Sequence, residues 1–328
     1  MNGNQPSIQI FEPFGAAYEL MKKILFQPFD LGKWCIIGFA AFMSGSIGGG
    51  FRIPFTSKQH WNLDSFIHTS GSSSDSFQCW VVPFIVTFWI LIVAIAIVLM
   101  WVSARGRFIF TDCVVRNRAA IALPWNEYRR EGNSFFLFSL VVAVLTMMIV
   151  GGLALMVAVP LGLFSHHKAS ELHAIAIIAL VFIGLIALCI ALFVALVTQF
   201  MVPVMYRRRC LAREAFSDVI SLFLAQPGPI ILFVLFGIVL VMAVTVVSTV
   251  VSCITCCIAG LPYVSSVVLL PAFVWLLAFK LLFLRQFGPE YDVWAVVESP
   301  ALPPTPEPPA TPQPPSPSDA PPPPPAQT

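Results

Sequence analysis

Long apolar runs separated by short polar segments dominate the pattern of this chain. A helix needs about 20 mainly apolar residues to cross a membrane, and the runs at residues 34–51, 80–104, 134–164, 172–205, 229–260 and 263–279 meet that requirement. The first run is the weakest, because it ends in SGSIGGGF, whose glycines loosen a helix. The pattern predicts an all-α polytopic transmembrane helical bundle of about six spans.

The positions of the Lys and Arg residues predict how this bundle is oriented. Of the 18 basic residues, only Arg52, Lys58 and Lys168 fall on one side of the predicted spans. Short loops rich in Lys and Arg usually face the cytoplasm. We therefore expect both chain termini in the cytoplasm, which an even number of spans also requires.

Three segments that lead from the cytoplasm into a span resemble one another. They are YELMKKILFQPFDLGKW, CVVRNRAAIALPWNEYRREGNS and MYRRRCLAREAFSDVISLFLAQPGP, and each has a basic stretch, a proline-bearing turn and a glycine. An offset of about 100 residues also relates Asp112 to Glu214, and Arg105 and Arg107 to Arg207 and Arg209. We interpret this pattern as a threefold parallel repeat of an interfacial helix and two spans. The alternative is that any helix entering from the cytoplasm shows these residue types.

The predicted interfacial helices carry the polar residues of a candidate site. In the third, apolar positions from Ala215 to Phe223 share one stripe, which is typical of a helix on a membrane surface. The second is polar on two faces, so one face should pack against protein, with Asp112 and Arg116 paired at i,i+4. A basic loop at the membrane surface is the alternative. The candidate interfacial charge cluster is Arg105, Asp112, Arg116, Arg207 and Glu214.

Two segments differ in composition from the spans. Residues 52–79 form an outer loop whose second half is rich in Ser and Gly. Residues 298–328 are rich in proline and should be disordered, with polyproline II character. We therefore divide the chain into a membrane domain, residues 1–297, and a cytoplasmic tail, residues 298–328. The PxxP spacing of the tail suits a partner that binds proline-rich motifs, although a tail without a partner is also consistent with it.

The composition supports a membrane location and excludes several functions. Of the 328 residues, 58% are hydrophobic and 10% are charged, whereas a soluble domain has roughly 25% charged residues. The lipid bilayer is therefore the expected partner. No basic run with interleaved aromatic residues predicts nucleic-acid binding.

The predicted spans carry few groups that could react or bind an ion. Their apolar centres contain no Asp, Glu, Lys, Arg or His, whereas ion-coupled transporters and pumps usually keep one there. The main polar groups of the fifth run are hydroxyls, and hydroxyls in spans commonly join helices; they are Thr245, Ser248, Thr249 and Ser252. No nucleophile elbow, P-loop or zinc motif is present. We expect no enzyme activity, no cofactor and no metal.

Eight cysteines divide between the two sides of the predicted membrane. Cys79 begins the second run on the outer side, and Cys253, Cys256 and Cys257 end the fifth run at a similar level. An oxidising exterior permits a disulfide between Cys79 and one of the other three. Alternatively, all four are small apolar packing residues.

Two stretches carry a resemblance to known proteins. LFQPFDLGKWCIIGFAAFMSGSIGGGF and SARGRFIFTDCVVRNRAAIALPWNEYRREGNSFFLF resemble a family of uncharacterised bacterial six-span integral membrane proteins, over about residues 14–294. They are similar in style to the membrane domain of glycerophosphodiester phosphodiesterases, whose soluble phosphodiesterase domain this sequence lacks. The resemblance implies a multi-pass protein of the bacterial inner membrane and no catalytic residue. Its GKW, PW and Phe-x-Asp elements occur here as Gly32-Lys33-Trp34, Pro124-Trp125 and Phe110-Thr111-Asp112, which we interpret as interface anchors and helix junctions.

Three functions are consistent with these patterns. A non-enzymatic scaffold or envelope-associated factor explains the uncharged spans, the surface helices and the proline-rich tail. The alternative is a carrier or channel for an apolar or lipid-like solute, which needs no charge inside the membrane. A lipid-modifying enzyme would need a polar cluster around Asp112 and Glu214.

Overall fold

The computed structural model describes residues 9–45, 75–164, 169–254 and 262–295, which form helices joined by turns, with no strand among them. The all-α prediction is confirmed for this part of the chain. Most of the predicted outer loop and the whole predicted tail lie outside the described residues. The helices are α1 (Phe11–Leu25), α2 (Leu31–Met43), α4 (Asp75–Val115), α5 (Ala122–Glu127), α6 (Arg129–Phe164), α7 (Ala169–Arg208), α8 (Ala212–Ala225), α9 (Pro227–Ile254), α10 (Pro262–Val268) and α11 (Leu270–Arg285), followed by the 3-10 helix Pro289–Tyr291.

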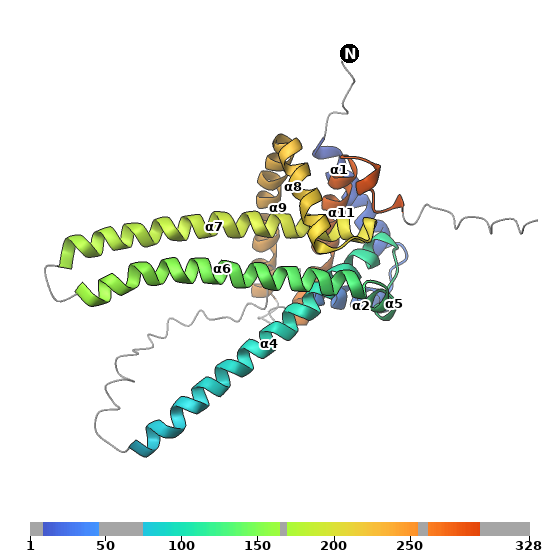
Figure 1. Cartoon of the computed structure of the whole chain (residues 1–328). Coiled ribbons are helices and arrows are strands. Elements are labelled where there is room, and N and C mark those ends of the chain that lie inside the picture. The colour runs from blue at the N-terminus through green and yellow to red at the C-terminus, as the bar shows by residue number, and fades with distance from the viewer. Residues whose placement is uncertain (1–8, 46–74, 165–168, 255–261, 296–328) are drawn as a thin grey trace, which may run out of the picture.

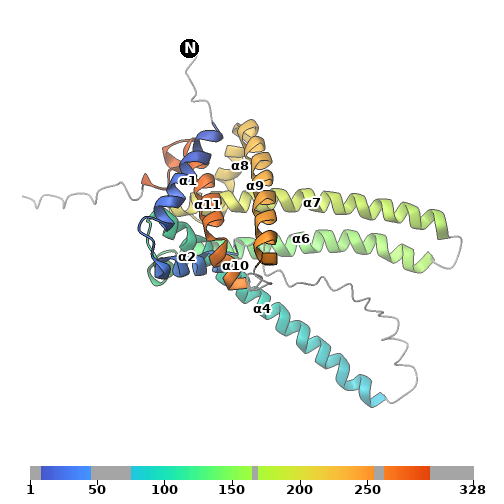
Figure 2. The same cartoon turned by 180° about the vertical axis from the view of Figure 1, so that it is seen from behind.

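The short helices form a compact head together with one end of α4, α6 and α7 (Figures 1 and 2). Helix α11 lies at its centre, since its buried side chains cover most of its circumference, as expected of an apolar helix inside protein. Helix α1 packs on α11 through buried residues at helical spacing, among them Ala17, Met21 and Ile24. The ring of Phe14 lies 4.7 Å from that of Trp275. The head thus has its own hydrophobic core.

Three long helices project from this head. Helices α6 and α7 leave it side by side, whereas α4 leaves at a different angle and diverges from them (Figure 1). Helix α9 runs steeply across α7 near the head in both views (Figures 1 and 2). The two helices meet where the rings of Phe200 and Phe233 lie 5.3 Å apart. Helix α9 therefore does not run parallel to the other long helices.

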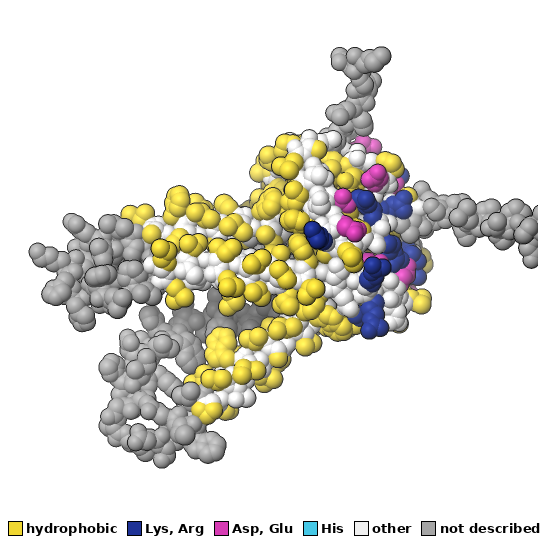
Figure 3. Space-filling model, in the orientation of Figure 1, with side chains coloured by type: hydrophobic (Ala, Val, Ile, Leu, Met, Phe, Trp, Pro, Cys, Tyr) yellow, Lys and Arg dark blue, Asp and Glu magenta, His cyan; other side chains and the backbone are white. Residues whose placement is uncertain are grey.

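Four helical stretches are long and apolar enough to cross a membrane. They are Pro83–Val115, Arg129–Leu153, Ile178–Arg208 and Pro227–Val251, with mean hydropathy between 2.5 and 3.2 in their most apolar windows. In each stretch, at most 17% of the most apolar window is buried inside the protein. Figure 3 shows hydrophobic side chains covering the parts of α4, α6 and α7 that project from the head, which we call the arms. Lys, Arg, Asp and Glu gather on the head. Because soluble monomers rarely expose apolar patches larger than a few hundred Å², these helices indicate a membrane protein.

Two of the six predicted spans correspond to short helices. The predicted span 34–51 begins in α2, which has 13 residues, and the span 263–279 is divided between α10 and α11 at Leu269. The indole N–H of Trp34 donates a hydrogen bond to the Val267 carbonyl at 2.9 Å, so α2 and α10 pack together in the head. The count of six spans is therefore not confirmed, because hydropathy alone does not separate a helix buried in protein from one buried in lipid.

The boundary predicted near Ala104 is wrong, since α4 continues without a break to Val115. The second predicted interfacial helix is thus the head end of a long helix. The expectation that one of its polar faces packs against protein is confirmed. Arg105 is only 6% exposed and Asp112 is fully buried, because both find polar partners in the head.

The third predicted interfacial helix is a separate helix, α8. Its predicted apolar stripe is confirmed, because Ala215, Val219, Leu222 and Phe223 are all buried. The stripe packs against α7, α6 and α9, however, and not against lipid. Phe223 lies 5.5 Å from Phe200 of α7, ring to ring. The amphipathic pattern was correctly recognised, but the surface that it covers is protein.

Candidate functional site

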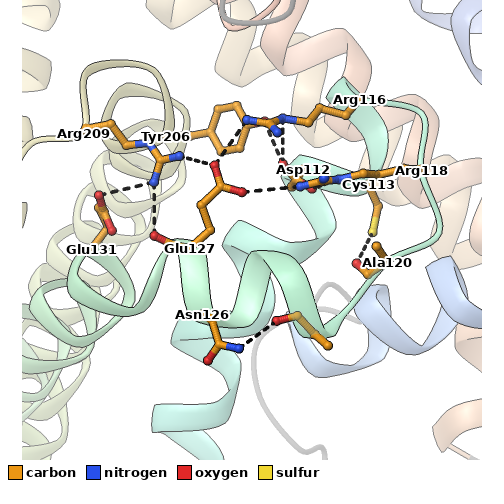
Figure 4. Close-up of polar contacts among 11 residues, drawn as sticks. Asp112, Cys113, Arg116, Arg118, Ala120, Asn126, Glu127, Glu131, Tyr206 and Arg209 are labelled. Carbon is orange, nitrogen blue, oxygen red and sulfur yellow. Dashed lines mark hydrogen bonds and ion pairs between the residues drawn. The ribbon is translucent and has the colours of Figure 1, made fainter.

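The head end of α4 and the turn after it meet the α5–α6 junction and the end of α7 (Figure 4). Helices α4 and α7 are each followed by a left-handed residue, Asn117 with φ 49° and Arg209 with φ 53°. Such a residue ends a helix and reverses the chain. The N–H of Arg118 donates to the Cys113 carbonyl at 3.2 Å, and that of Arg209 to the Met205 carbonyl at 2.9 Å. These two turns direct Arg118 and Arg209 toward the same place.

Asp112 is the first centre of this site, and its side chain is fully buried. Its Oδ2 accepts a hydrogen bond from Nε of Arg118 at 2.8 Å, and its Oδ1 accepts one from the Tyr206 hydroxyl at 3.0 Å. Nε of Arg116 lies 3.2 Å from Oδ1, which confirms the predicted i,i+4 pair. A buried carboxylate is costly unless it is paired and hydrogen-bonded. The two arginines and the tyrosine therefore supply the partners that the buried Asp112 side chain needs inside the head.

Glu127 of α5 is the second centre. Its carboxylate contacts Arg116 at 3.3 Å, Arg118 at 3.5 Å and also Arg209. Arg209 reaches further to Oε1 of Glu131 at 3.6 Å and donates to the Glu127 carbonyl at 3.2 Å. We call the six charged residues together the charge network; they are Asp112, Glu127, Glu131, Arg116, Arg118 and Arg209. Its three acidic and three basic groups balance.

A stack of three aromatic rings packs against the charge network. The rings of Phe108 and Tyr128 are stacked at 6.0 Å, and those of Tyr128 and Tyr206 at 4.9 Å. The Arg209 guanidinium lies 3.9 Å from the centre of the Tyr128 ring, a cation–π contact. Burial raises the pKa of the Tyr128 phenol. The stack thus connects α4, the α5–α6 junction and α7 through aromatic rings that lie beside the charged groups.

Arg105 lies in a different environment on the same helix. Its guanidinium is 4.4 Å from the Trp101 ring and 4.8 Å from the Trp125 ring. Its Nη2 donates to Oδ1 of Asn133 at 2.8 Å, and the backbone of Gly132 leaves room for the side chain. Arg105 therefore joins α4 to α5 and α6, has no carboxylate partner in the part of the chain that the structure describes, and is not part of the charge network.

The predicted cluster is only partly brought together. Asp112 and Arg116 meet in the charge network, while Arg105 lies among the tryptophans. Glu214 is exposed on α8 and makes no ion pair among the described residues. Arg207 lies with Arg208 and Glu290 around an open hollow on the head, and it makes no ion pair with Asp112 among the described residues.

The predicted outer disulfide lies at the edge of the described part of the chain. Cys79 lies near the start of α4, and Cys253 near the end of α9 is an exposed free thiol. Cys256 and Cys257 fall outside the described residues. The pairing of Cys79 with one of them stays a prediction.

Five residues of the site were absent from the predicted cluster, namely Arg118, Glu127, Glu131, Tyr206 and Arg209. Tyr206 and Asp112 are separated by 94 positions, so no local spacing joins them. The available signal was the ending of the two helices, since Asn117 and Arg209 both follow a basic residue at the close of a long apolar helix. A helix ending of this kind predicts a turn, but it does not predict which distant residues the turn contacts.

The arrangement is suited to holding helices together. The hydrogen bond to Asp112 raises the pKa of Arg118, so this arginine stays charged throughout the physiological range. A general base must reach its substrate, and Asp112 has no exposed surface to offer one. Each link of the charge network joins different segments, so the loss of one charge affects the junction as a whole.

Comparisons with known proteins identify a family. No curated protein and no solved structure matches the chain. The model of a family of unknown function, DUF7544, matches residues 8–297, which include every described helix. The chain therefore belongs to the family of unknown function DUF7544.

Proposed function

We propose that this protein is a non-enzymatic scaffold or envelope-associated factor embedded in the bacterial inner membrane. The observation that carries the proposal is the self-pairing of the charge network. Glu127 of α5 pairs with Arg209 after α7, and Asp112 of α4 accepts from Tyr206 of α7 and pairs with Arg118 in the turn after α4. These contacts stabilise the joint between the helices. The apolar arms then face lipid, and the head offers a rigid charged surface beside the membrane.

The alternative, a carrier for an apolar or lipid-like solute, has weaker support. A hydroxyl-lined path along the fifth predicted span would favour it. The Thr245 hydroxyl donates to the Val241 carbonyl at 2.8 Å, and the Thr249 hydroxyl donates to the Thr245 carbonyl at 2.9 Å. Both threonines are exposed on α9. Their hydroxyls thus satisfy their own helix, as is common in membrane helices.

Reconstitution into liposomes distinguishes the scaffold from the carrier. The purified protein is placed in vesicles, and transfer of a fluorescent phospholipid between leaflets is measured beside protein-free vesicles. The scaffold proposal predicts equal rates, since no path through the protein is required. Faster transfer that depends on the protein and is unchanged by Thr245→Val with Thr249→Val would indicate transport along its surface. Faster transfer abolished by that double variant would support the carrier.

The proline-rich tail is the proposed attachment point for a soluble partner. Residues 298–328 follow the head, which lies at the basic end of the long helices. Association of a cytoplasmic protein with the full chain, and its loss from a chain ending at residue 297, would support this role. Equal association with both forms would place any contact on the head.

We further propose six crossings with both termini in the cytoplasm, built as a threefold parallel repeat. The support is that α4 and α7 share the same left-handed ending, and that basic residues gather at one end of the long helices (Figure 3). In this arrangement α2 and the α10–α11 pair would be short crossings beside the long ones.

Cysteine labelling in intact cells tests this orientation. In a chain whose native cysteines are replaced, Asn117→Cys is placed in the turn after α4, and Lys168→Cys between α6 and α7. We expect an impermeant maleimide to label position 168 in intact cells, and position 117 only after permeabilisation. The reverse pattern would place the head outside the cell.

A further inference from the structure

Two opposite charges face one hollow of the head without meeting each other. Arg207, Arg208 and Glu290 line this open hollow, which has a volume of about 360 Å³. Arg207 and Glu290 make no ion pair with each other or with any other described residue. Nε of Arg207 is buried and has no hydrogen-bond partner in the described part of the chain. Since most buried polar groups are hydrogen-bonded, an orphaned guanidinium N–H beside an open hollow favours a ligand-binding site.

The wall that carries Glu290 is held in place by its neighbours. Glu290 lies in the 3-10 helix Pro289–Tyr291, which packs against α7 and α11. Val293, just after this helix, is fully buried. Nε of Arg285 lies 2.9 Å from Oδ2 of Asp292, and this ion pair ties the segment back to the end of α11. The exposed Glu290 side chain is therefore presented by a fixed segment.

The opposite wall of the hollow is the last turn of α7. Met205 and Tyr206, which precede the two arginines, are buried in the head, so the backbone of this turn is fixed as well. Arg208 is paired with Asp218 of α8. Arg207 therefore remains as the lining cation that has no acidic partner among the described residues. A site whose walls are ordered before the ligand arrives loses less entropy on binding.

The position and size of the hollow indicate what kind of ligand reaches it. The stretch Ile178–Arg208 is apolar and long enough to cross a membrane, and Arg207 and Arg208 lie in its final turn, inside the head (Figure 1). Basic residues at the end of a span usually reach the lipid headgroups. Small-molecule sites have volumes of roughly 300–1,000 Å³, so about 360 Å³ suits a headgroup and not a whole lipid.

We propose that this hollow binds a group that carries both a phosphate and a primary ammonium, the chemistry of phosphoethanolamine, either as a phospholipid headgroup or as a free molecule. Guanidinium binds phosphate oxygens in a planar fork, so Arg207 binds the phosphate. An ammonium donates hydrogen bonds to a carboxylate, so Glu290 binds the ammonium. The site goes beyond the scaffold function, which does not depend on it.

The same chemistry disfavours a quaternary ammonium at this site. A trimethylammonium group has no N–H to donate to Glu290, and proteins usually bind such groups between aromatic rings. The described residues that line the hollow are two arginines and a glutamate, without an aromatic ring. We therefore expect phosphatidylethanolamine to bind more tightly than phosphatidylcholine.

Binding of three phospholipids tests the role of each charge. The full chain is purified in detergent, and its binding of phosphatidylethanolamine, phosphatidylcholine and phosphatidylglycerol is measured by native mass spectrometry. Arg207→Gln should weaken the binding of phosphatidylethanolamine and of phosphatidylglycerol about tenfold, because both contain the phosphate. Glu290→Gln should weaken phosphatidylethanolamine about tenfold. It should leave phosphatidylglycerol unchanged or tighter, because that lipid has no ammonium and is repelled by the carboxylate.

Arg130→Gln and Glu12→Gln are the matched controls. Both residues are exposed, make no ion pair among the described residues and do not line the hollow. Each control should bind all three lipids as the unchanged protein does. Since Glu290 is exposed and has no partner in the described part of the chain, Glu290→Gln should fold normally. Its effect on lipid preference therefore tests the site even if Arg207→Gln destabilises the head.

Soluble phosphoethanolamine, measured by calorimetry, separates the two sources of the ligand. Binding that both Arg207→Gln and Glu290→Gln lose supports the site and assigns it to the free molecule. Selective binding of the lipid alone supports the site and assigns it to a headgroup. Phosphatidylethanolamine binding that Glu290→Gln leaves unchanged overturns the site. An equal loss of phosphatidylethanolamine and phosphatidylglycerol in Glu290→Gln, or an equal loss in the controls, overturns it as well.

Discussion

Asp112→Asn should lower the free energy of unfolding more than any other single polar substitution in the head. Asparagine keeps the shape of the side chain and can still accept from Tyr206, but it removes the negative charge between Arg116 and Arg118. Removing one partner of a buried ion pair usually costs about 3–5 kcal/mol. Because the two arginines are partly exposed, we expect about 2–4 kcal/mol.

The measurement is a denaturant titration in detergent micelles, followed by far-ultraviolet circular dichroism. Asp218→Asn is the matched control, because Asp218 pairs with Arg208 on the surface of the head. An exposed pair contributes about 0–1 kcal/mol, so the control should unfold almost as the unchanged protein does. If Asp112→Asn lost no more stability than the control, the charge network would not be what holds the head together.

Gly106→Ala should be the most harmful substitution of a small residue. A Cβ atom at this position would lie 2.5 Å from the Met43 carbonyl carbon and 2.7 Å from the Ser44 nitrogen. These are backbone atoms at the end of α2, so no flexible side chain can move aside. The close approach is also where the Ser103 hydroxyl donates to the Ser44 carbonyl at 3.2 Å. Small residues allow helices to approach this closely.

Overpacking of a rigid contact costs about 1–3 kcal/mol, and the higher helix propensity of alanine offsets at most about 1 kcal/mol of it. The same denaturant titration should therefore show a clear loss of stability for Gly106→Ala. Gly151→Ala is the control, since a Cβ atom there meets nothing within 4 Å on α6. We expect it to be neutral or slightly stabilising. Equal stability of the two variants would mean that α2 and α4 do not cross as closely as described.

The sequence predicted features that depend on near neighbours. The apolar stripe of α8 from Ala215 to Phe223 and the Asp112–Arg116 pair follow from helical spacing alone. The long apolar runs of α4, α6, α7 and α9 were equally visible, because a helix facing lipid must be apolar over its whole length. Such elements can be predicted from the residues within them, without knowledge of what they pack against.

Features that depend on distant partners were not predictable in the same way. Glu127 meets Arg209 across 82 positions of sequence, and nothing local to either residue indicates the other. The run 263–279 has the hydropathy of a span, but the sequence does not show that it divides into α10 and α11 or that α11 packs against other helices. Hydropathy reports transfer out of water and does not distinguish protein from lipid surroundings. The continuation of α4 past Ala104 was missed because polar residues suggested a boundary, whereas Arg105 and Asp112 find their partners inside the head.

A double-substitution cycle across Asp112 and Arg118 tests most directly whether the charges of the head act as a structural joint. The free energy of unfolding is measured for the unchanged protein, Asp112→Asn, Arg118→Gln and the combination. Residues in contact within one network show coupling of about 0.5–3 kcal/mol, and the 2.8 Å hydrogen bond between these side chains predicts a clear coupling. The second substitution should then cost much less once the first is present. Additive losses would contradict the account, because the two charges would then stabilise the protein independently of each other.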